Sequence, residues 1–177
     1  MSGSGFGATA SVCPTDQVTV LNAVVAKIRQ DMSDIFGNDQ TCFITARPIP
    51  SVEVSEEMFC TVCPDSSQFD QGMPDGGASW QICENSVFRV TAFTKIALDQ
   101  TEHETIAFLD DHRGLLVLKK RLLQCLAGQQ LYSPAGNQLL LECLRPAHCR
   151  HEENRQDMDD FSSFGLSFEG RFFWDLT

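Results

Sequence analysis

The chain has 177 residues, of which 42% are apolar and 21% are charged, an ordinary composition for one globular domain. Its 24 acidic residues outnumber the 13 basic ones. The resulting net charge of −11 argues against tight nucleic-acid binding, because phosphate contacts need Lys and Arg. No apolar run approaches the roughly 20 residues that span a bilayer, and the start lacks the pattern of a secretion signal. We therefore expect a soluble protein made in a cytoplasm, with a flexible arm at residues 1–14 and one domain at residues 15–177.

The first expected element is an amphipathic helix between Thr15 and Gly37. Thr15 or Asp16 can cap its N-terminus, and Gly37 can end it in the left-handed conformation. Such a helix should lie with its apolar side on a sheet. The apolar residues that recur at helical spacing are Val18, Leu21, Val24, Val25, Ile28, Met32, Ile35 and Phe36.

Extended structure is expected next. Thr41–Ala46 and Phe59–Cys63 are rich in β-forming residues, and each is followed closely by proline. Ser66–Ser79 consists mainly of Gly, Asp, Ser, Gln and Pro, which predicts a mobile surface loop. A long strand should then cover about Ser86–Leu98, with both faces partly covered because its alternation is imperfect.

Helical structure is expected again over Glu102–Gly128. Asp110 and Asp111 can begin its main piece, and Gly128 can end it. The apolar stripe of this piece consists of Leu115, Leu116, Leu118, Leu122, Leu123 and Leu126.

The chain should finish as a β-hairpin with a long loop, formed by Leu139–Leu144 and Phe164–Trp174. The second strand is rich in aromatic residues, so it must be docked in a sheet or against a partner rather than frayed. Together these elements predict an α+β fold: a mixed or mainly antiparallel sheet of about five strands, packed by two main helices and ending in the long-looped hairpin.

Eight cysteines raise the question of metal binding. Without a secretion signal, reduced thiols packed as small apolar side chains are the favoured interpretation. The alternative is a zinc site formed by Cys60, Cys63, Cys149 and His151. It is disfavoured because Cys60 and Cys63 lie three residues apart in a predicted strand, which directs their side chains to opposite faces.

No catalytic pattern is present in the sequence: it has no Gly-rich phosphate loop, no GxSxG elbow and no HExxH motif. His103 and His112 flank an expected helix start among acidic residues, where an exposed histidine is the ordinary interpretation, and Asp110–Asp111 serves equally well as a helix cap. We therefore expect neither an enzyme nor a bound cofactor.

The order of elements resembles the tail-terminator and tail-completion proteins of tailed bacteriophages, also called minor tail or neck proteins. The resemblance covers residues 15–177 and is carried by the first helix, the strand pair after it, the long strand ending in Ala97-Leu98-Asp99, the helix from Gly114 to Gly128, and the final strand closing on Phe172–Leu176. It implies a virion protein of the tail or neck, made in the cytoplasm of a bacterial host. Such a protein forms a ring, usually of six subunits, on the head-proximal end of the tail tube, ends tube polymerisation and joins the tail to a head-completion or neck protein. Genomic double-stranded DNA passes through the lumen without specific binding.

Two charged segments are the expected interface residues of such a ring. Lys119, Lys120 and Arg121 form a basic group that is either a solvated helix face or a contact with an acidic neighbour. The segment between the last two strands is mostly acidic, through Glu152, Glu153, Asp157, Asp159 and Asp160. We expect the two groups to meet across subunits or at the tube junction. The alternatives are a head–tail adaptor, a tail-tube protein, the zinc module above, and a bacterial enzyme of unknown type.

Overall fold

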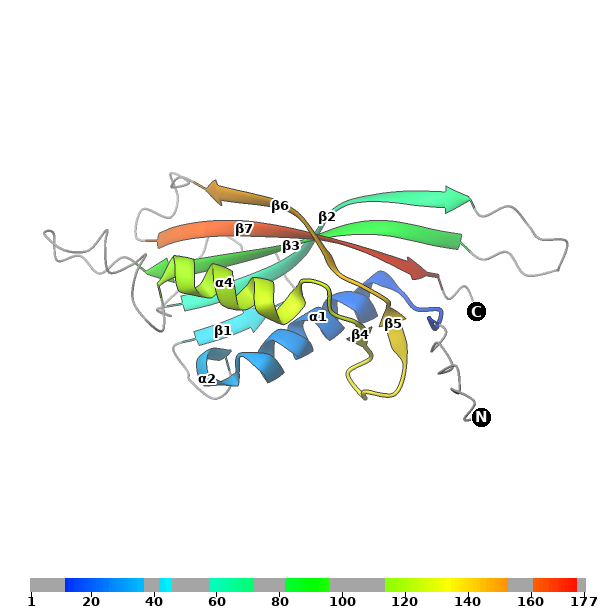
Figure 1. The fold of residues 1–177 in the computed structure, drawn as a ribbon, viewed down its shortest axis with the longest axis horizontal. Helices are drawn as coiled ribbons and strands as arrows, with labels where there is room; N and C mark the ends of the chain where they lie inside the picture. The colour runs from blue at the N-terminus through cyan, green and yellow to red at the C-terminus, as the bar shows by residue number, and fades with distance from the viewer. Residues whose placement is uncertain are drawn as a thin grey trace, which may run out of the picture.

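A computed structural model of the protein describes residues 12–36, 42–45, 58–71, 82–95, 114–152 and 161–174. Its centre is a five-stranded sheet with the order β1-β2-β3-β7-β6 (Figure 1). β1 runs parallel to β2, and every other neighbouring pair is antiparallel. The strands are β1 (Cys42–Thr45), β2 (Met58–Gln71), β3 (Ile82–Lys95), β6 (Arg145–Glu152) and β7 (Phe161–Phe173). This sheet confirms the predicted α+β fold with a mainly antiparallel sheet of five strands.

Two helices, α1 (Gln17–Asp31) and α4 (Leu115–Leu126), lie on the same side of the sheet (Figure 1) and share one hydrophobic core with it. Asp16 caps α1, since its carboxylate accepts a hydrogen bond from the Thr19 N–H at 2.8 Å. Gly114 occupies the N-cap position of α4. The expected earlier part of this second helical region, including Asp110 and Asp111, lies outside the described residues. None of the described helices is long and apolar enough to cross a bilayer.

The helix expected up to Gly37 is interrupted. α1 ends at Asp31, Met32 leaves helical geometry with φ −121° and ψ 37°, and a short helix α2 (Ser33–Phe36) follows. The predicted apolar stripe still faces the core on both pieces. Val18 is the exception at 68% exposure. The first turn of α1 contacts the sheet through Gln17 instead, whose amide donates to the Ser86 hydroxyl at 3.4 Å.

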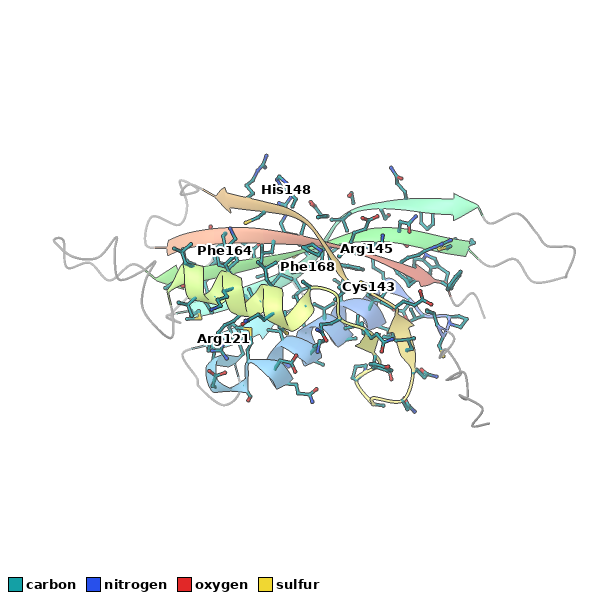
Figure 2. The ribbon with its side chains drawn as sticks, in the orientation of Figure 1. Arg121, Cys143, Arg145, His148, Phe164 and Phe168 are labelled. Atoms are coloured by element: carbon teal, nitrogen blue, oxygen red, sulfur yellow. The ribbon has the colours of Figure 1, made fainter. Side chains whose placement is uncertain are left out.

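β7 provides the centre of the core, as predicted for the C-terminal strand. It lies between β3 and β6. Phe164 and Phe168 pack between β7 and α4 (Figure 2), and Phe172 continues the same row with no exposed surface. Gly170 also belongs to this row, and a Cβ there would lie 3.0 Å from the Leu141 side chain. The missing side chain therefore lets the segment around Leu141 approach the sheet closely.

The predicted partner of the C-terminal strand is wrong. β7 pairs with β6 rather than with Leu139–Leu144. Leu139–Leu141 form β5, which pairs in a separate two-stranded sheet with β4 (Leu131–Tyr132). All three leucines of β5 are buried. A fully apolar run is suited to the layer under the sheet, whereas the polar residues of β6 are suited to an exposed sheet edge.

The predicted loop at Ser66–Ser79 also begins later than expected. β2 continues to Gln71, and Ser66–Gln71 pair in register with Ile82–Val87 of β3. Backbone hydrogen bonds to a neighbouring strand therefore override a composition that favours a loop. The remainder of the expected loop, residues 72–79, lies outside the described residues.

Only the end of the expected N-terminal arm is described. Cys13 donates its backbone N–H to the Leu139 carbonyl at 2.8 Å, and Thr15 forms a parallel bridge with Trp174. The start of the domain is thus attached both to β5 and to the residue that follows β7.

Candidate interaction surface

The residues of the alternative zinc site do not converge. Cys60 and Cys63 lie on β2, Cys149 and His151 lie on β6, and β3 and β7 separate these strands. Neighbouring strands are about 4.8 Å apart, so β2 and β6 are about 14 Å apart. Zinc–ligand bonds are only about 2.0–2.3 Å long. Cys60 is also fully buried, and burial raises the pKa of the Cys63 thiol. The fold therefore cannot place these four residues around one ion.

The basic group on α4 is already partly paired within the chain. Arg121 forms a bidentate ion pair with Asp34, with nitrogen–oxygen distances of 2.7 and 2.6 Å. The hydrogen bond to Asp34 raises the pKa of the Arg121 guanidinium. Lys119 is half-buried and Lys120 is exposed. Arg121 thus connects α4 to α2, and the two lysines remain as candidate contact residues.

The acidic group cannot be placed against this basic group. Glu152 is the last residue of β6, while Glu153, Asp157, Asp159 and Asp160 lie outside the described residues. The predicted contact between the two groups therefore stays a prediction.

Apart from the stacked Phe59 and Phe93 rings near β1, the sheet face turned away from α1 and α4, here called the distal face, is polar. Its central row contains Cys63, Arg89, Ser167 and His148, which lie opposite one another across β2, β3, β7 and β6. The Arg89 guanidinium binds the Asp65 carboxylate at 2.8 Å. A hydrophobic core could not tolerate such a row, so this part of the face is suited to water or to a polar partner.

Basic side chains gather on the distal face where β6 forms the edge of the sheet. Arg145, His148 and Arg150 are all exposed, and Figure 2 shows His148 directed away from the helices. These three residues were not among the predicted interface residues, because no strand was predicted at β6. The sequence does contain a signal for this strand. The polar residues His148 and Arg150 alternate with the less polar Cys149 shortly after Pro146, as is typical of a strand.

A hollow of about 480 Å³ lies on the distal face beside the start of β6. It is lined by Glu142, Cys143, Arg145, Glu169, Arg171 and Phe173, among others. The Arg171 side chain is held in place, because its Nε donates to the Cys83 sulfur at 2.7 Å and its guanidinium lies over the Phe173 ring. Two arginines and two glutamates give the hollow mixed charge, so it does not select a ligand of one sign.

The sheet has two unlike edges. β1 pairs with β2 only between Met58 and Thr61, so from Val62 onward no described strand pairs with the outer edge of β2. Every residue from Pro64 to Phe69 is exposed. At the other edge, β7 is the sole neighbour of β6 among the described strands. Such edges present unpaired backbone N–H and C=O groups to any chain that can add a strand.

No protein-family model matches the sequence, and no curated protein matches it. Among solved structures, the chain is similar to a chain of the virion of a native gene transfer agent particle. The TM-score is 0.56 at 12% sequence identity, and the likeness covers 88% of this chain and 96% of the other. At this identity the likeness shows a shared fold over nearly the whole of both chains.

Proposed function

We propose that this protein is a structural component of a phage-like virion, acting as a tail terminator. In this role it forms a ring, of six subunits as is usual in the family that it resembles, at the head-proximal end of a tail tube. The ring ends tube polymerisation and joins the tail to a head-completion or neck protein. The observation that carries the proposal is the fold that the chain shares, over 88% of its length, with a chain of a gene transfer agent virion. The proposal assigns the chain no catalytic role and no cofactor.

The two unlike sheet edges support a ring. A contact between two different surfaces of identical subunits closes into a ring when the rotation between subunits divides the circle. A contact between two identical surfaces would stop at a dimer. The free outer edge of β2 and the free edge of β6 supply two such different surfaces among the described residues.

The charge of the chain supports the passage of DNA without tight binding. Most of the affinity of proteins for DNA comes from Lys and Arg contacts with phosphate, and this chain carries a net charge of −11. On the distal face the basic residues alternate with acidic ones, as in the Arg89–Asp65 ion pair and the exposed Glu169. The described part of this face therefore offers no continuous basic track.

The test is to add the purified protein to polymerising tail tubes and to measure tube length and the position of the added protein by electron microscopy. A tail terminator should stop the tubes at a fixed length and appear as a ring at one end. An unrelated acidic protein at the same concentration serves as the control. Incorporation along the whole tube would make the chain a tube subunit instead, and no association with the tubes would refute the terminator role.

A further inference from the structure

We propose that β6 of one copy of this chain adds as an antiparallel strand to the outer edge of β2 in the next copy. The inference deepens the proposed function and rests on it for the ring, because it names the contact through which the subunits would join. Its occupant is a second copy of the same chain, and the contact is heterologous, with a different surface on each side.

The strand directions allow this addition. β2, β3, β7 and β6 follow one another in the sheet as antiparallel neighbours, so β6 runs opposite to β2. A neighbouring copy rotated about an axis along the strands would present its β2 in the direction opposite to β6. The antiparallel alternation then continues from subunit to subunit, and the helices of every copy stay on the same side of the joined sheet.

The irregularities of the two strands limit which positions can lie opposite each other. β2 has a register shift between Pro64 and Ser66, and β6 has one between Pro146 and His148. A pairing that slips by one residue would set the distal face of one copy against the helix side of the next. One pairing that keeps the faces aligned places Arg145 opposite position 70, Pro146 opposite Phe69, His148 opposite Gln68, Cys149 opposite Ser67 and Arg150 opposite Ser66.

Side-chain chemistry selects this register among those that keep the faces aligned. Phe69 is 60% exposed in the isolated chain, and the Pro146 ring would cover it. Of the two aspartates in β2 between Pro64 and Gln71, Asp65 is already paired with Arg89, and position 70, which this register places opposite Arg145, is the other. Cross-strand pairs of opposite charge and apolar cross-strand pairs both stabilise a sheet.

The proposed register also staggers the strands, as a closed sheet requires. Within one subunit, Arg145 of β6 is aligned across the sheet with Ser66 of β2, because Arg145 pairs with Glu169, Glu169 with Val87, and Val87 with Ser66. In the proposed contact Arg145 lies opposite position 70 of the next copy, so the pairing is staggered along β2. A sheet can close into a barrel only if its strands are staggered in this manner.

The contact predicts one particular disulfide. Residues directly opposite each other in antiparallel strands have Cβ atoms about 4.5–5.5 Å apart, close to the separation that a disulfide spans. Ser67 is exposed, and Cys149 is a free, half-buried cysteine. In the Ser67→Cys variant, mild oxidation of the concentrated full-length protein should link position 67 of one copy to Cys149 of the next. The expected product is a ladder of covalent dimers, trimers and higher species on a non-reducing gel.

Two matched controls isolate the contact. The ladder should disappear in Ser67→Cys/Cys149→Ser, which lacks the partner thiol, and it should be absent in Ser66→Cys, whose added thiol lies on the distal face. Thermal midpoints equal to that of the native chain show that each variant folds. Absence of a ladder in Ser67→Cys, or a ladder that persists without Cys149, overturns the proposal.

Because this test needs no tubes, it is separate from the test of the proposed function. Terminated tubes without the ladder would refute only this contact, and a ladder without terminated tubes would refute only the terminator role.

Discussion

Phe172 and Phe173 are adjacent residues at the end of β7, and truncating each to alanine should have very different consequences. Phe172 points to the helix side, has no exposed surface, and its ring lies 5.8 Å from the Trp174 ring. Phe172→Ala should lower the free energy of unfolding by about 3–5 kcal/mol, from the lost transfer energy and the cavity left behind. Phe173 is half-buried on the distal face. Phe173→Ala should lower the free energy of unfolding by about 1 kcal/mol.

Urea denaturation followed by circular dichroism gives both values, and calorimetry gives the accompanying change in Tm. For a domain of this size, Phe172→Ala should lower Tm by about 10 °C and Phe173→Ala by about 3 °C. Both variants remove the same atoms from neighbouring positions, so strand propensity and hydrophobicity are matched. Equal losses would contradict the burial of one face of β7, and a larger loss from Phe173→Ala would mean that the faces of the strand are reversed.

The Arg121–Asp34 ion pair is partly exposed to solvent, so a double-mutant cycle with alanine should give a coupling free energy of about 0.5–1 kcal/mol. Zero coupling in urea denaturation would contradict the pair. Burial, with the Asp31 carboxylate nearby, raises the pKa of Cys125 from its ordinary 9.0 to about 12. The native Cys125 thiol should therefore be alkylated at pH 8 about a thousandfold more slowly than an ordinary thiol. Because the pKa of Cys125 is higher in the folded than in the unfolded protein, the contribution of this thiol to stability should be intact below pH 9 and be lost between pH 9 and 12. Gly170→Ala should lower the free energy of unfolding by about 1–2 kcal/mol, because the new Cβ would lie 3.0 Å from Leu141. Gly165→Ala, whose nearest contact would be 3.5 Å away, is the matched control, and equal losses in urea denaturation would contradict the tight packing at Gly170.

Local patterns in the sequence were sufficient to predict burial where the pattern lies within a single helix or strand. The helical spacing from Leu21 to Phe36 predicted the buried side of α1 and α2, although not the break at Met32. The aromatic content of the C-terminal strand predicted that β7 would be docked in the sheet, and Phe164, Phe168 and Phe172 are buried there. These patterns are readable because the period of side-chain burial is set by the backbone geometry of the element itself.

The candidate interaction surface was much less accessible from sequence. Arg145, His148 and Arg150 form one group only because β6 lies beside β7 at the edge of the sheet. The zinc alternative fails because β3 and β7 lie between β2 and β6. Arg121 was expected in a contact between subunits, but its bidentate partner is Asp34, which lies 87 positions away in the chain.

Composition, charge and periodicity by themselves determined the α+β class, the buried aromatic strand at the C-terminus and the acidic character of the chain. The tertiary structure alone decided the strand order, the extension of β2 to Gln71, the replacement of Leu139–Leu144 by β6 as the partner of β7, and the two free edges. The physical reason is that a strand is stabilised by its neighbours. Hydrogen bonds and side-chain pairs across a sheet join residues far apart in the chain, so the pattern within one segment cannot specify which segment it pairs with.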